Sequence, residues 1–157
     1  MAAYDDPMAH QRETEALSQV AGRLGWDQET MMPRDAGPQR GAEMAAMEGV
    51  LHARRTDPRV ADWLAQAETS GDVAVAQVRH IRRAFDRASK VPAKLASEIA
   101  RVTSEAQGAW AIARAADDFA AFAPVLKQVV ALKREEGAAL SAGGDVYDAM
   151  LDDYEPG

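Results

Sequence analysis

The sequence predicts an all-α fold, a bundle of about six to seven helices that forms a single helical domain over residues 1–157. Three observations indicate helices instead of strands. Alanine is the commonest residue and β-branched residues are sparse. Proline residues lie almost entirely between the periodic segments. Within those segments, apolar residues recur every three or four positions, as on one face of a helix.

The first helix is expected to begin near the amino terminus. Asp5 or Asp6 is predicted to cap it, and Pro7 to occupy its first turn. Its end is predicted between Gly25 and Pro33. The residues that repeat at helical spacing are Leu17, Val20, Ala21 and Leu24.

A second helix is expected after a loop at residues 35–38. Its methionines fall at helical spacing and are interpreted as core residues. The apolar stripe of this helix consists of Met44, Met47, Val50 and Leu51. Thr56 or Asp57, ahead of Pro58, is predicted to begin a short third helix. The residues of that helix that should point inward are Val60, Trp63 and Leu64.

Residues 69–72 should end the third helix and cap a fourth. The expected inward face of the fourth helix holds Val75, Val78, Ile81 and Phe85. Its other face is basic and is interpreted as solvated, with Arg79, Arg82, Arg83 and Arg87. Residues 90–92 break the pattern, and a long helix should follow from Pro92. The apolar positions of this long helix are Leu95, Ile99, Val102, Ala106, Trp110 and Ala113.

Asp117 or Asp118 can cap the next helix, in which a break is expected near residues 122–124 because Pro124 has no N–H group. The apolar residues of this helix are Phe119, Phe122, Leu126, Val129, Val130 and Leu132. Gly143 and Gly144 are predicted to end it, as a helix C-cap and not as a phosphate-binding loop. A last short helix should run from Asp145, with Val146, Tyr147, Met150 and Leu151, before an acidic tail at residues 152–157.

Composition and charge exclude several classes of function. There are 25 acidic and 18 basic residues, and a net charge of −7 gives no general attraction for a nucleic acid. No apolar run approaches the roughly 20 residues that cross a membrane. The absence of cysteine excludes disulfides, thiol nucleophiles and thiolate zinc sites. Residues 1–13 contain no apolar stretch typical of a secretory signal, and we expect a cytoplasmic protein.

No catalytic residue and no metal ligand are predicted within this chain. A zinc site on one helix needs two histidines a turn apart, but His10, His52 and His80 fall on separate predicted helices. They are interpreted as surface or partly buried side chains. Adjacent acids such as Glu135 and Glu136 point about 100° apart on a helix and are interpreted as a solvated face.

Two polar stretches that contain an aromatic residue stand out. In residues 26–30, Trp26 could fill the core while Asp27 or Thr30 caps a turn, or the polar groups could form the wall of a cleft. In residues 152–157, the sequence predicts a turn in which Tyr154 is an aromatic anchor.

Four segments are informative together: LGWDQETMMP at residues 24–33, RGAEMAAMEGVLHARRTDP at residues 40–58, the stretch at residues 100–136, and YDAMLDDYEPG at residues 147–157. In this order and spacing they resemble the amino-terminal part of the thermostable carboxypeptidase (carboxypeptidase Taq) family of metallopeptidases. The resemblance implies a cytoplasmic, all-helical, homodimeric enzyme that removes carboxy-terminal residues from peptides with a zinc-type divalent metal. In the family, a His-Glu-x-x-His helix and a later Glu hold the metal downstream of the matched part. This sequence contains none of them.

The role that the resemblance implies for this chain is therefore architectural, as one wall or lid of a substrate cleft, and we expect the chain alone to be inactive. Its partners would be the remainder of the peptidase chain, peptide substrates and a second copy, and zinc or another divalent metal would belong to the full-length enzyme. The residues expected nearest the cleft are Trp26, Asp27, Gln28, Glu29, Asp152, Asp153, Tyr154 and Glu155. The alternative is a self-contained helical interaction module without enzymatic activity.

Overall fold

The structure is a computed structural model that describes residues 2–155. Within this range it contains seven α-helices, one short 3-10 helix and no strand, so the all-α prediction is confirmed. The elements are α1 (Ala2–Thr30), η1 (Arg34–Ala36), α2 (Gly37–Arg55), α3 (Pro58–Gln66), α4 (Asp72–Lys90), α5 (Ala93–Ala115), α6 (Phe119–Ser141) and α7 (Val146–Leu151). No described helix combines the length and the apolar character that a membrane crossing requires.

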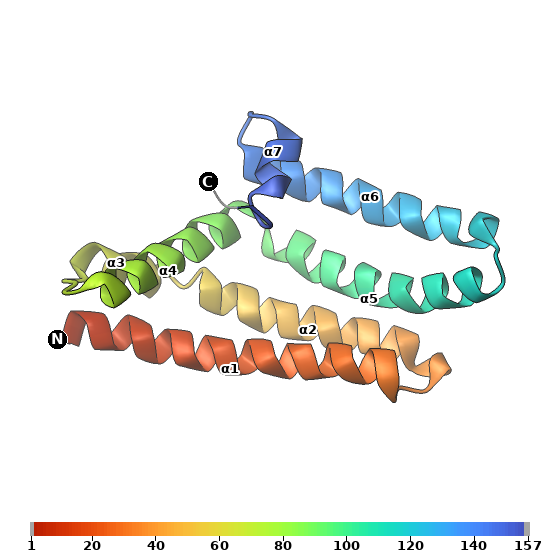
Figure 1. The fold of residues 1–157 in the computed structure, drawn as a ribbon, viewed down its shortest axis with the longest axis horizontal. Coiled ribbons are helices and arrows are strands. Elements are labelled where there is room, and N and C mark those ends of the chain that lie inside the picture. The colour runs from red at the N-terminus through yellow and green to blue at the C-terminus, as the bar shows by residue number, and fades with distance from the viewer. Residues whose placement is uncertain (1, 156–157) are drawn as a thin grey trace.

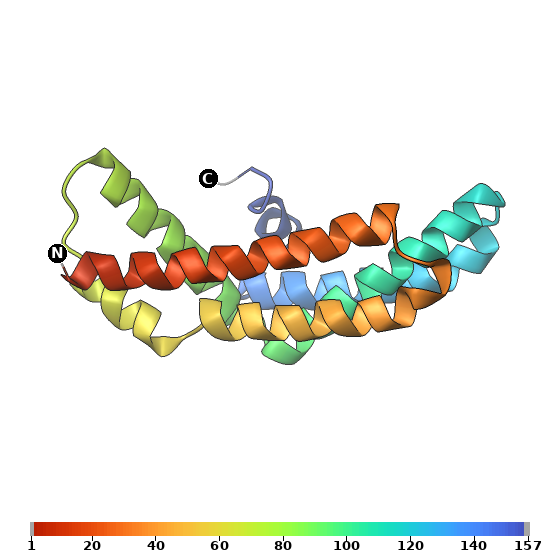
Figure 2. The same ribbon diagram turned by 90° about the horizontal axis from the view of Figure 1, so that it is seen from below.

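Four long helices form the body of the molecule. Figure 1 shows α1, α2, α5 and α6 side by side in one row, each antiparallel to its neighbour. In Figure 2, α3 and α4 diverge on either side of the end of α1 that carries the amino terminus. The short helix α7 crosses α6 at the other edge of the row (Figure 1). The fold is therefore an extended row with a smaller cluster of helices at one end.

The main apolar cluster lies at the end formed by α1, α3 and α4. Its buried residues are Met8, Val60, Leu64 and Ile81, and Tyr4, Trp63, Val78 and Phe85 pack against them. This packing explains why α1 begins before the predicted cap at Asp5 or Asp6. Tyr4 and Met8 are anchored on the other helices, and burial of these side chains outweighs the single backbone hydrogen bond that Pro7 cannot make inside α1.

Small residues allow α2 and α5 to approach closely. A Cβ atom at buried Gly41 would lie 2.8 Å from Glu105 Oε1 and 3.3 Å from the carbonyl oxygen of Arg101. Two turns further along α2, the same atom at Gly49 would lie 3.6 Å from Ser97 Oγ. The seam between these helices therefore requires a residue without a side chain at Gly41.

Two predicted interruptions are wrong. Residues 35–38 are not a loop, because η1 runs into α2 and Pro38 occupies the first turn of α2, where a missing N–H group costs nothing. α6 is continuous through Pro124, five residues after its start. The break predicted there does not occur, since packing against α5 holds the helix despite one lost hydrogen bond.

The predicted helix ends near residues 57 and 142–145 are confirmed. The Asp57 side chain caps α3 by accepting from the N–H of Arg59, and Asp145 caps α7 by accepting from two backbone N–H groups. After α6, Ala142 and Gly143 take positive φ values of 48° and 94°, the left-handed conformation that ends many helices. The prediction for residues 69–72 is wrong, because α3 already ends at Gln66 and α4 begins directly after Gly71, which has a φ of 85°, with no side-chain cap.

Several apolar residues expected to point inward are exposed. They are Val20, Val50, Val75 and Trp110, and the exposed fraction of Trp110 is 49%. Among the described residues no large side chain is completely buried. Helical spacing alone therefore does not identify which apolar residues this chain buries.

Candidate functional site

The last turns of α1 hold the segment from Trp26 to Glu29, for which the sequence left two interpretations open. α1 continues through Gly25 to Thr30, and Trp26 lies on its outer face with 63% of its surface exposed. The interpretation in which Trp26 fills the core is therefore wrong. Thr30 Oγ1 donates to the carbonyl oxygen of Trp26 over 2.7 Å, so Thr30 stabilises the end of the helix.

Asp27 ties α1 to α2 through an ion pair. Its Oδ2 atom lies 2.5 Å from Arg40 Nη2, while Arg40 Nε donates to Glu43 Oε2 over 2.9 Å and Nη1 donates to the carbonyl oxygen of Leu24. Arg40 is only 8% exposed. The hydrogen bond to Asp27 raises the pKa of Arg40, and hydrogen bonds from Gln39 and then Arg40 lower the pKa of Glu43. We call Asp27, Arg40 and Glu43 the Arg40 clamp.

Gln28 joins α1 to α5. Its Nε2 donates to the carbonyl oxygen of Ser104 over 2.7 Å, and Ser104 Oγ donates to Gln28 Oε1 over 2.8 Å. Ser104 is buried, so the amide satisfies both of its polar groups away from bulk water. This reciprocal pair fixes the end of α1 over the middle of α5.

A groove of about 900 Å³ lies beside this pair, between the end of α1, the start of α2 and the second half of α5. Gln28 and Glu29 line it, together with Arg34, Glu105 and Ile112 among others, whereas Trp26 and Asp27 do not. The groove thus combines apolar side chains with amide, carboxylate and guanidinium groups. Such a surface is suited to holding a polypeptide segment.

The acidic turn after α7 binds the basic face of α4. Arg83 Nη2 lies 2.7 Å from Asp152 Oδ2 and also donates to the carbonyl oxygen of Asp152. Arg87 forms an ion pair with Asp153 and donates to the carbonyl oxygen of Ala149 over 3.2 Å. The predicted solvated face is therefore wrong for Arg83 and Arg87, because the chain folds back onto it. The four-residue spacing of Arg83 and Arg87 places them on one face of α4, but no signal in the sequence pairs that face with Asp152 and Asp153.

Tyr154 and Glu155 follow in the same turn. The turn is confirmed over residues 152–155, since the N–H groups of both residues donate to the carbonyl oxygen of Leu151 over 2.8 and 3.0 Å, while residues 156 and 157 of the predicted turn lie outside the described residues. Tyr154 is 83% exposed, so its predicted role as an aromatic anchor is wrong within this chain. The ion pairs of Asp152 and Asp153 hold the turn in its place.

The two candidate segments lie in different parts of the molecule. Residues 26–29 end α1, and the groove beside them contains no residue of the acidic turn. Residues 152–155 follow α7, which crosses α6 near α4 (Figure 1). The assignment of both segments to the border of a peptide cleft stays a prediction.

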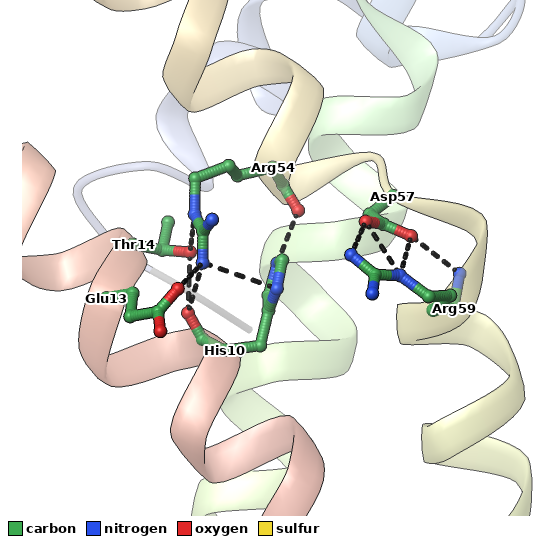
Figure 3. A network of polar contacts seen from close by, with 6 residues as sticks. All are labelled: His10, Glu13, Thr14, Arg54, Asp57 and Arg59. Atoms are coloured by element: carbon green, nitrogen blue, oxygen red, sulfur yellow. Dashed lines mark hydrogen bonds and ion pairs between the residues drawn. The ribbon is translucent and has the colours of Figure 1, made fainter.

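Sequence reasoning missed a polar network between α1 and α2, shown in Figure 3. Arg54 is at its centre: Nε donates to Thr14 Oγ1 over 3.0 Å, and Nη2 lies 3.0 Å from Glu13 Oε2 and donates to the carbonyl oxygen of His10 over 3.0 Å. His10 Nε2 lies 2.9 Å from the carbonyl oxygen of Arg54, where the ring must be the donor. The network ties the first half of α1 to the end of α2.

Asp57 and Arg59 lie next to this network (Figure 3). Arg59 Nη2 is 2.7 Å from Asp57 Oδ2, and its backbone N–H donates to Oδ1 over 2.9 Å. The hydrogen bonds of the Arg59 side chain, and to a smaller extent that of its backbone N–H, lower the pKa of Asp57 to about 2. The pair stabilises the start of α3, and we assign it a structural role.

Two of the three histidines form hydrogen bonds within the fold, and the third lies on the surface. His10 belongs to the network above, buried His52 has its Nε2 2.7 Å from the carbonyl oxygen of Val91, and His80 is exposed on α4. Among residues 2–155, no group of three or more His, Cys, Asp or Glu side chains is arranged to hold a metal ion. We therefore assign the described residues no step of metal chemistry.

Comparison with known proteins supplies the family. The family described as carboxypeptidase Taq (M32) metallopeptidase matches residues 7–157. Thermostable carboxypeptidase 1 of Thermus thermophilus is 41% identical over 99% of this chain, which covers 34% of that protein.

Solved structures agree with this match. Metallocarboxypeptidase 1 of Trypanosoma cruzi superposes with a TM-score of 0.75 and 30% identity over all of this chain and 32% of its own. The carboxypeptidase of Pyrococcus furiosus gives a TM-score of 0.76 and 27% identity over 100% of this chain and 32% of its own. This chain spans about a third of the length of these relatives. The predicted resemblance is confirmed, and the chain belongs to the carboxypeptidase Taq (M32) metallopeptidase family.

Proposed function

We propose that this chain is the amino-terminal helical part of a metal-dependent carboxypeptidase that releases carboxy-terminal residues from peptides, and that it acts only together with the remainder of that enzyme. One observation carries the proposal. The 41% identity to the Thermus thermophilus protein extends over 99% of this chain but over only 34% of that protein. A similarity that fills this chain from end to end supports the proposal that it is one part of such an enzyme. That the chemistry lies in the other part is what the family resemblance implies.

The contribution of this chain is a rigid wall beside the substrate. The groove next to Gln28 and Glu29 offers a surface for a peptide or for another segment of the enzyme. The Arg40 clamp and the pair of Gln28 with Ser104 hold three helices around it in one geometry. Because these helices are already held in place, the energy of substrate binding is used to position the substrate and not to order the protein.

The divalent metal belongs to the remainder of the enzyme in this proposal. The side chains of this chain that could ligate a metal are spread over the fold or paired with arginines. The choice of zinc and the homodimer come from the family resemblance, and the cytoplasmic location from that resemblance and from residues 1–13. All three remain predictions for the whole enzyme.

A chimera tests this function. The matched third of the Thermus thermophilus protein is replaced by this chain, and release of the carboxy-terminal amino acid from a short peptide is measured in the presence of a divalent metal. We expect activity from the chimera and none from either part alone. A chimera that folds but releases no amino acid, at metal concentrations that activate the Thermus thermophilus protein, would favour the alternative of a helical interaction module.

A further inference from the structure

We propose that the outer face of α6 is the docking surface for a helix supplied by the remainder of the metallocarboxypeptidase chain. The surface consists of four apolar residues, Phe119, Phe122, Leu126 and Val130, which we call the α6 stripe. This inference rests on the proposed function, because its occupant is the part of the enzyme that this chain lacks.

The α6 stripe follows helical geometry. Its members are three, four and four residues apart, so at about 100° per residue they lie within roughly 80° of one another around the helix axis. Phe119 is 68% exposed, Leu126 37% and Val130 40%, whereas Phe122 is half-buried and lines a pocket next to Trp110 and Ala113 of α5. Anchors at this spacing, in a row along one helix, are typical of a surface that receives a second helix.

The same face of α6 is already an interface further along. Gly137 lies seven residues after Val130, and a Cβ atom there would be 2.6 Å from Val146 Cγ1 and 3.2 Å from Met150 Cγ, both in α7. Gly137 is buried, so α7 packs directly on the helix backbone at this point. α7 has only six residues and crosses near one end of α6 (Figure 1). Beyond it, Val130, Leu126 and Phe119 stay exposed.

The length of the relatives identifies what covers the open part. In the solved Trypanosoma cruzi and Pyrococcus furiosus structures, this fold makes up 32% of each chain. The other two thirds have to pack against it for the enzyme to be one globular body, and an apolar row that continues an existing interface is the surface such packing uses.

The charges beside the stripe specify the docking helix further. Exposed Lys127 and Arg134 are seven residues apart and flank the stripe on one side, about 60–80° from Phe119 around the axis. The partner is therefore an amphipathic helix with apolar residues at matching spacing and carboxylates along one edge. Like charges placed opposite these cations would be repelled.

The test compares two double substitutions in two settings. Leu126→Asp with Val130→Asp places carboxylates on the stripe, and Gln128→Asp with Ala131→Asp places the same groups on exposed positions of the other side of α6. Both variants are made in this chain alone and in the chimera described above. The thermal midpoint, Tm, and the helical circular dichroism of each protein are measured.

We expect the stripe variant to lower the Tm of the chimera at least twice as much as that of the isolated chain, because the carboxylates are buried only in the chimera. The control variant should lower both equally. In the isolated chain, the stripe variant should also bind less of a fluorescent dye specific for apolar surfaces.

Equal Tm losses in the chimera and the isolated chain would overturn the proposal, as would unchanged dye binding. A dimer of the isolated chain that the stripe variant alone converts to monomer, with no excess loss in the chimera, would assign the surface to a second copy instead. The two proposals fail separately. An inactive chimera with the expected excess Tm loss counts only against the proposed function, and an active chimera without it counts only against the docking surface.

Discussion

Removal of the guanidinium of Arg40 should loosen the contact between α1 and α2. The substitution Arg40→Met keeps a long apolar stem but loses the bonds to Asp27, to Glu43 and to the carbonyl oxygen of Leu24. Breaking a buried ion pair costs about 3–5 kcal/mol, whereas an exposed pair contributes about 0–1 kcal/mol.

The Arg40 clamp falls between these limits. The arginine side chain is 9% exposed, but the side chains of Asp27 and Glu43 are 40% and 38% exposed and can be rehydrated. We therefore expect Arg40→Met to lower the free energy of unfolding by about 2 kcal/mol. For a chain of this size, that loss corresponds to a Tm about 4–8 °C lower.

Thermal unfolding followed by circular dichroism measures this loss directly. Arg23→Met is the matched control, because Arg23 is an exposed residue of α1, and its Tm should stay at that of the parent chain. Arg40→Lys should fall between the two, since lysine keeps the charge but not the planar fork. A Tm of Arg40→Met that equals that of Arg23→Met would refute the reasoning from burial and ion pairing.

Three other outcomes follow from the described contacts. Replacing Arg83 and Arg87 by Ala should release the acidic turn and therefore speed hydrogen exchange of the Tyr154 and Glu155 amides. The control, Arg79→Ala, should leave this exchange unchanged. Equal exchange rates in the two variants would contradict the ion pairs. Asp57 has its pKa lowered to about 2 from 3.8, so its contribution to stability is complete above pH 3.8 and is lost as the pH falls towards 2. Asp57→Asn, which keeps a capping side chain, should therefore be less stable than the parent to urea at pH 5, and the difference should shrink at low pH; a difference that grows on acidification would contradict this sign. Gly137→Ala should lower the free energy of unfolding by about 1–3 kcal/mol, because its Cβ would lie 2.6 Å from Val146 Cγ1. Gly108→Ala is the control and should be neutral or stabilising, since its Cβ would have nothing within 4 Å. A neutral Gly137→Ala would argue against the contact with α7.

Local signals were sufficient to predict the helices and most of their ends. Asp57 followed by Pro58, Asp118, the glycines at 143 and 144, and Asp145 all act within one turn of the chain, and the structure uses each as predicted or within a residue. The start of α1 and the continuity of α6 were not predictable in this way. Packing on α3, α4 and α5 decides them, and the sequence of one helix does not specify its neighbours.

The candidate site shows the same limit. Arg83 and Asp152 are 69 residues apart, and Arg87 and Asp153 are 66 apart. Periodicity places both arginines on one face of α4, but it cannot say that the chain returns to cover that face. The sequence left open whether Trp26 fills the core, and the structure shows that α1 continues through Gly25 and turns this side chain outward.

The most direct test of the central claim is the intact mass of the native protein in its source cells, determined together with the coding sequence beyond the codon for Gly157. The account predicts a product about three times the 16.9 kDa of this chain, because the chain covers 34% of its Thermus thermophilus relative. That product should contain the His-Glu-x-x-His segment that the family resemblance implies. A native product of 16.9 kDa that purifies without any metal-binding peptidase partner would contradict the account and leave a helical interaction module.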